Sequence, residues 1–162
     1  MKEDTPQTFV EYEPNRLASR GKRLAAAVVD SIIFFPLALM IAQPLGLINI
    51  SDPANMQGFN LVQPIQLFVI GQVLFLLVQG YLLHTQGQTI GKKLLKIRIV
   101  SLDDKLLGIG QLYFVRYLTF SLIAQIPYIG GLIGIVNVLF IFGKDRRCLH
   151  DRLAGTKVIE AT

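Results

Sequence analysis

The stretch RGKRLAAAVVDSIIFFPLALMIAQP, residues 20–44, decides the fold. It begins with three cations in four residues and then turns apolar, with one acid, Asp30, inside the apolar run. A bilayer core of about 30 Å needs roughly 20 apolar residues in a helix. The run is too long for the apolar core of an export signal and has no obvious A-x-A cleavage site. We therefore expect a retained membrane helix over residues 23–47.

The rest of the chain fits a membrane domain. Of its 162 residues 52% are hydrophobic, and the mean hydropathy of +0.50 exceeds that of ordinary soluble domains. A second apolar run predicts a helix over 61–83, and a third region, interrupted by Pro127 and Gly130, predicts two shorter helices over 106–126 and 128–143. We predict an all-α membrane protein, a helical bundle of two clear and two shorter transmembrane or re-entrant helices. A polar N-terminal tail (1–22) precedes the membrane domain (23–160).

The cations predict the orientation, because lysine and arginine beside membrane helices stay in the cytoplasm. We therefore expect a multi-pass protein of the inner (plasma) membrane with both termini and the middle loop cytoplasmic. Such basic blocks attract anionic lipid at the cytoplasmic face. They show no recognition-helix pattern, so the net charge of +5 does not indicate nucleic-acid binding. The blocks are Lys2, Arg16, Arg20, Lys22 and Arg23; Lys92, Lys93, Lys96, Arg98 and Lys105; and Lys144, Arg146, Arg147, Arg152 and Lys157.

Two stretches predict a small cytoplasmic strand and turn element under the helices. LKIRIVSLDDKLLG (95–108) alternates apolar and basic residues before a turn, and TKVIE (156–160) is a candidate partner strand. GQTIGKK (87–93) lacks the spacing of a phosphate-binding loop. We expect it to form a tight turn in which Gly87 and Gly91 allow close approach of the backbone.

Several of these residues together resemble the RDD family of small bacterial membrane proteins. Arg23, Asp30 and Asp151 match the arginine and two aspartates that name the family, and Arg116 matches a further arginine. GQTIGKKLLKIRIV (87–100) resembles the stretch after the second membrane helix of that family, and LHDRLAGTKVI (149–159) is similar to its closing His-Asp motif. The resemblance implies a helical membrane domain and a suspected role in transport, with sodium/proton antiport attributed to some members.

Asp30 is the candidate transport residue. It lies seven residues after Arg23, two helical turns along the same face. An aspartate at the bilayer centre costs roughly 3 kcal/mol and is tolerated when it faces the bundle interior, a cation or water. We expect Arg23 to tune Asp30 for exchange of a proton against a cation, with Gln72 and Gln79 as neutral oxygen ligands. The alternative is structural, with Asp30 paired to Arg23, Arg116 or a backbone amide.

Asp151, which follows His150, also has two interpretations. It is a cytoplasmic gate or second ion site, or an anchor that ties the tail to the bases of the middle loop. With two histidines in the chain, a multi-histidine metal centre is not expected, and we predict neither a metal nor another cofactor. Arg116 and His150 are candidate structural or gating residues.

The leading functional hypothesis is a small-cation transporter that uses sodium or another small cation and protons. The alternative is a structural or interaction module that anchors lipid or protein partners at the cytoplasmic membrane. No nucleophile, base and orienting group can be assembled, so an enzyme is not expected. Four short helices enclose little space, which favours a homo-oligomer.

Overall fold

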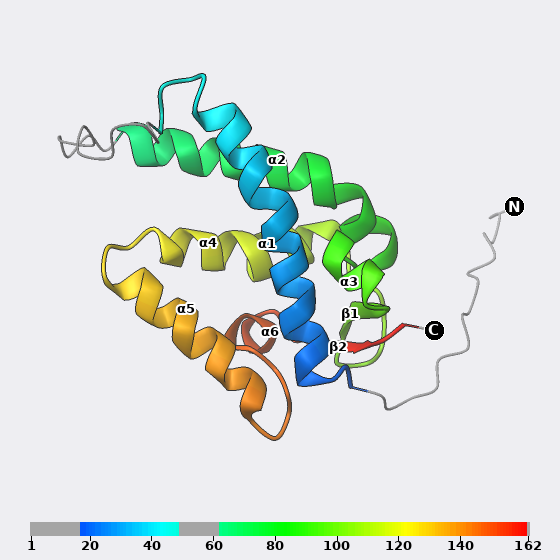
Figure 1. Cartoon of the computed structure of the whole chain (residues 1–162). Helices are drawn as coiled ribbons and strands as arrows, with labels where there is room; N and C mark the ends of the chain where they lie inside the picture. Colours follow the sequence, from blue (N-terminus) through cyan, green and yellow to red (C-terminus); the bar gives the residue numbers. More distant parts are fainter. Residues whose placement is uncertain (1–16, 49–61, 162) are drawn as a thin grey trace, which may run out of the picture.

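The computed structural model describes residues 17–48 and 62–161 of the chain. The predicted tail up to residue 16 and the connection over 49–61 lie outside the described residues. Figure 1 shows the order of the elements. They are α1 (Arg20–Ala42), α2 (Val62–Gln86), α3 (Ile90–Leu94), β1 (Ile97–Ser101), the π-helix η2 (Gln111–Leu118), α4 (Thr119–Ala124), α5 (Ile129–Leu139), the 3-10 turn η3 (Phe140–Phe142), α6 (Leu149–Leu153) and β2 (Thr156–Glu160).

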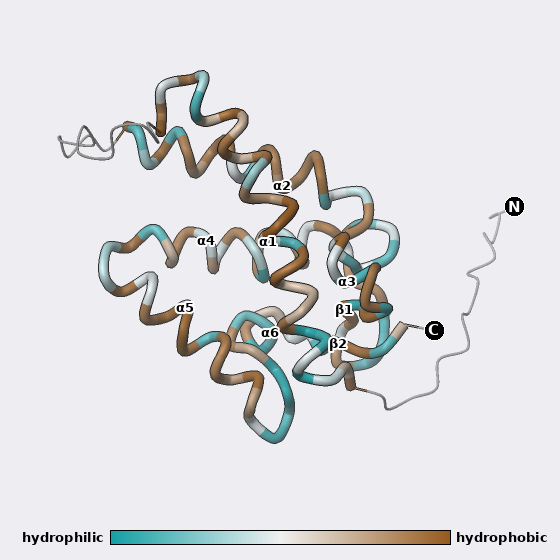
Figure 2. Tube along the Cα trace, viewed as in Figure 1, coloured by the Kyte–Doolittle hydropathy of each residue, from teal (hydrophilic) through white to brown (hydrophobic). Residues whose placement is uncertain are grey.

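The helices α1 and α2 have the length and surface of membrane-spanning helices, as predicted. They contain 23 and 25 residues, and at 1.5 Å per residue each exceeds the bilayer core. Only 6% and 17% of the most apolar part of each is buried within the protein, so their apolar side chains face outward rather than into a soluble core. Figure 2 shows hydrophobic residues along α1, α2 and α5, and hydrophilic ones in the connection from α5 to α6.

The boundaries of α1 differ from the predicted 23–47. The helix begins at Arg20 because the Ser19 side chain caps it, accepting a hydrogen bond from the Lys22 amide at 3.2 Å. It ends at Ala42, and the chain turns through Gly46, whose φ of +68° is a left-handed conformation.

The third apolar region forms a hairpin (Figure 1). Its first arm is η2 followed by α4, and its second arm is α5 followed by η3. The turn between them holds Tyr128 at a positive φ of 63° and Gly130, whose Cα lies so near α4 that a Cβ there would approach the Ala124 carbonyl oxygen to 2.3 Å. Residues 129–142 span about 21 Å as a helix, which is less than a bilayer core of about 30 Å.

The strands β1 and β2 pair antiparallel, with Ile97 opposite Glu160 and Ser101 opposite Thr156, as the sequence predicts. Leu17, just before α1, forms an isolated bridge with Ile159, so the two described ends of the chain meet at this sheet. A core forms where α1, α2, η2 and the strands converge. Its fully buried members are Ala18, Ala26, Leu83, Ile97, Ile99, Leu112 and Val158.

Gly87 and Gly91 allow the close backbone contacts that the sequence predicts. Gly87 has a φ of +63°, and a Cβ there would lie 2.5 Å from the Ile99 carbonyl oxygen; one at Gly91 would lie 2.2 Å from that of Ala26. The stretch is not only a turn, however. Thr89 starts the short helix α3 and accepts a hydrogen bond from the Lys92 amide, and Gly91 brings this helix onto α1.

Candidate functional site

The most deeply buried charge of the described chain is Asp151 on α6. Its side chain has no exposed surface, and it pairs with Arg23 of α1 and Arg116 of η2. The Arg116 Nη2 lies 2.6 Å from Asp151 Oδ1, and the Arg23 Nη2 contacts Oδ2. Both arginines are themselves buried, at 8% and 2% exposed. This arginine–aspartate–arginine cluster joins three elements that lie far apart in the sequence.

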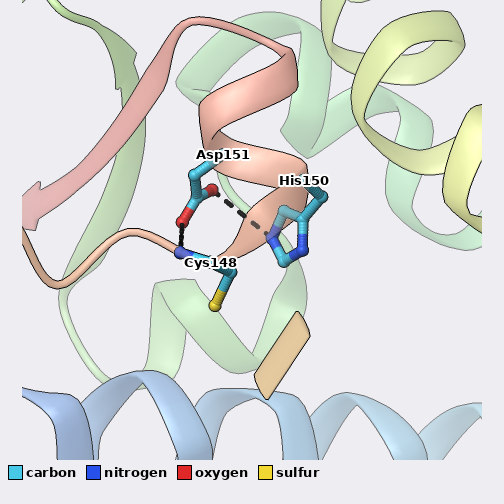
Figure 3. A group of neighbouring side chains, drawn as sticks. All are labelled: Cys148, His150 and Asp151. Atoms are coloured by element: carbon cyan, nitrogen blue, oxygen red, sulfur yellow. Dashed lines mark hydrogen bonds and ion pairs between the residues drawn. The ribbon is translucent and has the colours of Figure 1, made fainter. Parts of the chain in front are cut away.

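Two neutral donors complete the shell of Asp151. The Cys148 amide donates to Oδ2 at 3.0 Å, and the Thr156 hydroxyl donates to Oδ1 at 3.4 Å. The His150 ring lies beside the carboxylate, with its Nε2 3.4 Å from Oδ1 (Figure 3). Burial raises the pKa of this carboxyl, but the Arg116 and Arg23 guanidiniums outweigh burial and hold the pKa well below its ordinary value. Asp151 is therefore ionised at physiological pH, and its two oxygens face two cations.

The cluster gives Arg23 and Asp151 partners other than the expected ones. Arg23 does not pair with Asp30; its other donor bonds the carbonyl oxygen of Arg146. Asp151 pairs with Arg23 and Arg116, and among the described residues no base of the middle loop forms an ion pair with it. The reason is electrostatic: a fully buried carboxylate requires opposite charge, and both guanidiniums reach it.

His150 is a neutral member of the same cluster. Its Nδ1 lies 2.9 Å from Asn137 Oδ1, which places the ring proton on Nδ1, and its Nε2 faces Arg116 Nη2 at 3.3 Å as an acceptor. Burial, followed by the charge of Arg116, lowers the pKa of His150 to about 3. The Phe120 ring packs edge-on against it at 5.5 Å.

Acidification is expected to destabilise the protein through His150. An unfolded histidine titrates near pH 6.5, whereas the folded pKa is about 3, so between these values the unfolded state binds an extra proton. The free energy of unfolding therefore falls by at most about 1.4 kcal/mol per pH unit as the pH drops from about 6.5 to about 4.5. Unfolding of the detergent-solubilised protein across this window measures the slope. His150→Gln should flatten the slope and His84→Gln should keep it; an equal slope in the wild type and His150→Gln would disprove the assignment.

Cys148, His150 and Asp151 form a group whose ligand atoms lie within 4.8 Å of one another (Figure 3). A metal ion bound there would have to share Asp151 with Arg23 and Arg116. Burial also raises the pKa of the Cys148 thiol, which disfavours the thiolate that metals bind. The chemistry of this donor set favours an ion-pair network over a metal site.

Asp30 lies apart from the arginine cluster, half-buried on α1. Its Oδ1 accepts hydrogen bonds from Gln79 Nε2 at 3.1 Å and the Gly91 amide at 2.8 Å, and its Oδ2 accepts one from Thr89 Oγ1 at 2.5 Å. The backbone amide is one of the structural partners that the sequence allows for. All three donors are neutral, and in the described part of the chain no cationic side chain forms an ion pair with Asp30.

The Asp30 carboxylate borders a cavity of about 480 Å³, which we call the head cavity. Lys92 enters this cavity from α3, with its Nζ 3.3 Å from Thr89 Oγ1. The polar side of the cavity also contains Gln79, Arg116 and His150. Its apolar side consists of Ala27, Phe34, Phe35, Ala38, Phe75 and Tyr117. Charged groups and aromatic rings therefore share one space between the helices.

Gln72 is not part of this arrangement, although it shares a helix face with Gln79. It lines a second cavity of about 470 Å³, where its Nε2 donates to Ser121 Oγ at 3.1 Å and its Oε1 accepts from the Tyr113 hydroxyl at 3.0 Å. Phe75 and Tyr117, with ring centroids 4.8 Å apart, border both cavities. Gln72 and Gln79, which the sequence predicts as ligands of one cation, therefore line different cavities, and these aromatic rings border both.

Sequence reasoning missed Thr89 and Lys92 as members of the site. Thr89 carries a recognisable signal, because a threonine before a short helical stretch is a preferred N-cap. Lys92 does not, since it is one of five bases in the middle block and only its position on α3 directs it inward.

The fold and the site define a small helical membrane protein with a buried ion cluster beneath two long apolar helices. Residues 17–155 match the RDD family, and the chain belongs to this family. Over 140 residues it is 34% identical to the "Uncharacterized protein YckC" of Bacillus subtilis (strain 168), covering 86% of this chain and 82% of that protein. No solved structure matches the chain.

Proposed function

We propose that the protein transports small cations across the membrane, with Asp30 as the carboxylate that binds the cation or a proton. The observation that carries the proposal is the setting of Asp30. Asp30 is the one acidic residue in α1 and α2. It borders the head cavity, and its hydrogen-bond donors are neutral. Its negative charge is not cancelled by an ion pair within the described chain, so it is available to an incoming cation.

The neighbouring atoms suit a hard cation. Thr89 Oγ1 and the two Asp30 oxygens belong to one hydrogen-bonded group, and Gln79 Oε1, which accepts from the Ile90 amide at 2.8 Å, is close by. Sodium and similar ions prefer such oxygen ligands. Exchange of sodium for a proton on one carboxylate is the coupling that we propose.

The orientation that we propose places both termini in the cytoplasm. The bridge from Leu17 to Ile159 brings the described ends to one sheet, and the basic blocks surround that sheet in the sequence. The hairpin of α4 and α5 is short, which favours assembly of two or more copies around a pathway. Anionic lipid at the cytoplasmic face is a further proposed partner.

A structural module is the second candidate, and the three hydrogen bonds of Asp30 favour it. In this alternative the carboxylate serves to fix α2 and α3 against α1 through Gln79, Thr89 and Gly91. It then moves no ion, and the domain acts as an anchor for lipid or protein partners.

Flux measurements with the purified protein in liposomes separate these functions. Asp30→Asn keeps the side-chain shape and is expected to reduce sodium-driven proton flux at least tenfold, because the site loses its charge. Asp103→Asn, an exposed acid after β1, is the matched control and should retain full flux. Size-exclusion chromatography and unfolding midpoints verify that each variant folds. Undiminished flux in folded Asp30→Asn refutes the role of Asp30, and no flux of sodium or potassium in the wild type supports the module instead.

A further inference from the structure

Three adjoining spaces run from the outward face of α1 to the buried ion cluster, and Ala27 lines all of them. The first is an apolar groove on α1, here called the acyl groove; the second is the head cavity; the third is a small inner chamber behind it. We infer that these spaces form a binding site for one anionic amphiphile. Its acyl chain lies in the acyl groove, and its phosphate or carboxylate headgroup lies between Lys92 and Arg116.

The acyl groove has the chemistry of a hydrocarbon site. It has a volume of about 580 Å³ and lies on the outward face of α1, with Val28, Ile32 and Phe35 more than half exposed. No residue of its lining carries a charge. The lining consists of Leu24, Ala27, Val28, Ser31, Ile32, Phe35 and Pro36. In a bilayer these side chains face lipid, so a lipid tail reaches the groove without leaving the hydrocarbon core.

The head cavity meets the acyl groove at Ala27, Ser31 and Phe35 and continues inward. The inner chamber, of about 170 Å³, shares Lys92 and Arg116 with it. An amphiphile with its tail against α1 therefore directs its head toward the cations. A free anion dissolved in water would gain nothing from the acyl groove, and for this reason we assign the site to a lipid.

The charges around these spaces favour a negative headgroup. Arg23, Lys92 and Arg116 line the head cavity or the inner chamber, whereas their acidic counterparts are Asp30 on the wall and Asp151 behind the arginines. Three positive charges against two negative ones leave a net charge of +1. A bound anion would balance this charge in a region partly shielded from water.

Two hydrogen-bonding details agree with the charge balance. Arg116 is only 2% exposed, and its Nε is buried without a hydrogen-bond partner among the described residues. An anionic oxygen is the kind of acceptor that satisfies such a donor. Lys92 Nζ lies 3.3 Å from the neutral Thr89 Oγ1 and forms no ion pair with a described residue, so its charge is open to an anion.

The inference does not depend on cation transport, even though both uses share the head cavity. The proposed cation is bound at the wall formed by Asp30, Gln79 and Thr89, and the headgroup at Lys92 and Arg116. Asp30→Asn separates the two proposals, because it removes a negative charge from the cavity. It should reduce cation flux at least tenfold and leave lipid binding equal or tighter.

Native mass spectrometry and isothermal titration calorimetry of the full chain in uncharged detergent test the site. The probe is oleoyl lysophosphatidic acid, which has one acyl chain and one phosphate, and we expect one molecule to bind per chain. Lysophosphatidylcholine with the same acyl chain should bind at least tenfold more weakly. Inorganic phosphate alone should show no binding at the same concentration.

Two pairs of variants locate the binding. Lys92→Gln should weaken binding about tenfold through loss of a charged hydrogen bond, whereas Lys93→Gln, the exposed neighbour on α3, should not change it. Ala27→Phe should block the junction of the three spaces and weaken lipid binding. Ala25→Phe places the same ring elsewhere on the exposed face of α1 and should leave lipid binding unchanged. Unfolding midpoints check that all four variants fold.

Three outcomes would overturn the inference. Equal binding of the anionic and the zwitterionic lysolipid would mean that the lipid binds nonspecifically to the apolar surface of the protein. Equal binding of inorganic phosphate would reveal an anion site without an acyl chain. Unchanged affinity in folded Lys92→Gln and Ala27→Phe would place the lipid elsewhere on the molecule.

Discussion

Replacing Asp151 by asparagine is expected to lower the free energy of unfolding by about 3–5 kcal/mol. The substitution keeps the size of the side chain but removes the negative charge between Arg23 and Arg116. Two guanidiniums, each less than a tenth exposed, then face each other without a counterion in a poorly solvated interior. Denaturant titration of the protein in detergent, followed by circular dichroism, measures the loss.

The exposed acid Asp145 supplies the matched control. It pairs with Arg152 at 3.3 Å, but its side chain is 61% exposed, and Asp145→Asn should cost less than about 1 kcal/mol. A triple variant with Arg23→Met, Arg116→Met and Asp151→Leu removes all three charges and should regain part of the stability. If Asp151→Asn were no more harmful than Asp145→Asn, the buried cluster could not be what holds α1, η2 and α6 together.

Gly91→Ala is expected to destabilise the protein by about 2–4 kcal/mol. The added Cβ would lie 2.2 Å from the Ala26 carbonyl oxygen and 3.0 Å from Asp30 Cγ, and both neighbours belong to α1. Helix α3 must therefore move away from α1, and the Gly91 amide withdraws from the Asp30 carboxylate. Thermal unfolding and amide hydrogen exchange at α3 report the two effects.

Gly134→Ala in α5 is the comparison, because nothing lies within 4 Å of a Cβ at that position. Alanine in a helix interior is favoured over glycine by roughly 1 kcal/mol, so this variant should be neutral or slightly more stable. Similar stability losses in the two alanine variants would argue against tight packing of α3 on α1.

The parts of the fold that could be predicted depend on local composition. The helices α1 and α2 follow from the length of two apolar runs, and β1 and β2 from alternation in two short stretches that pair residue for residue. The short helices α3 and α6 could not be predicted in the same way. Five residues are too few for a stable isolated helix, and the stability of these two comes from Gly91 against α1 and Asp151 between two arginines.

In the site, the sequence indicates which charged residues are unusual but not which residues are in contact. The sequence identifies Arg23, Asp30 and Asp151 as unusual charges, but spacing along one helix relates Arg23 only to Asp30. The actual partner, Asp151, lies 128 positions away, and helix periodicity contains no information about such a distance. The neutral donors of Asp30 come from α2 and α3 and depend on how these helices pack.

The distance of 128 positions between Arg23 and Asp151 also affects how the chain is made. The ribosome synthesises Arg23 with α1 and Asp151 with α6, 128 positions later. Until α6 has been made, the guanidinium of Arg23 lacks its buried counterion. The buried cluster can therefore close only after synthesis of the chain has passed α6.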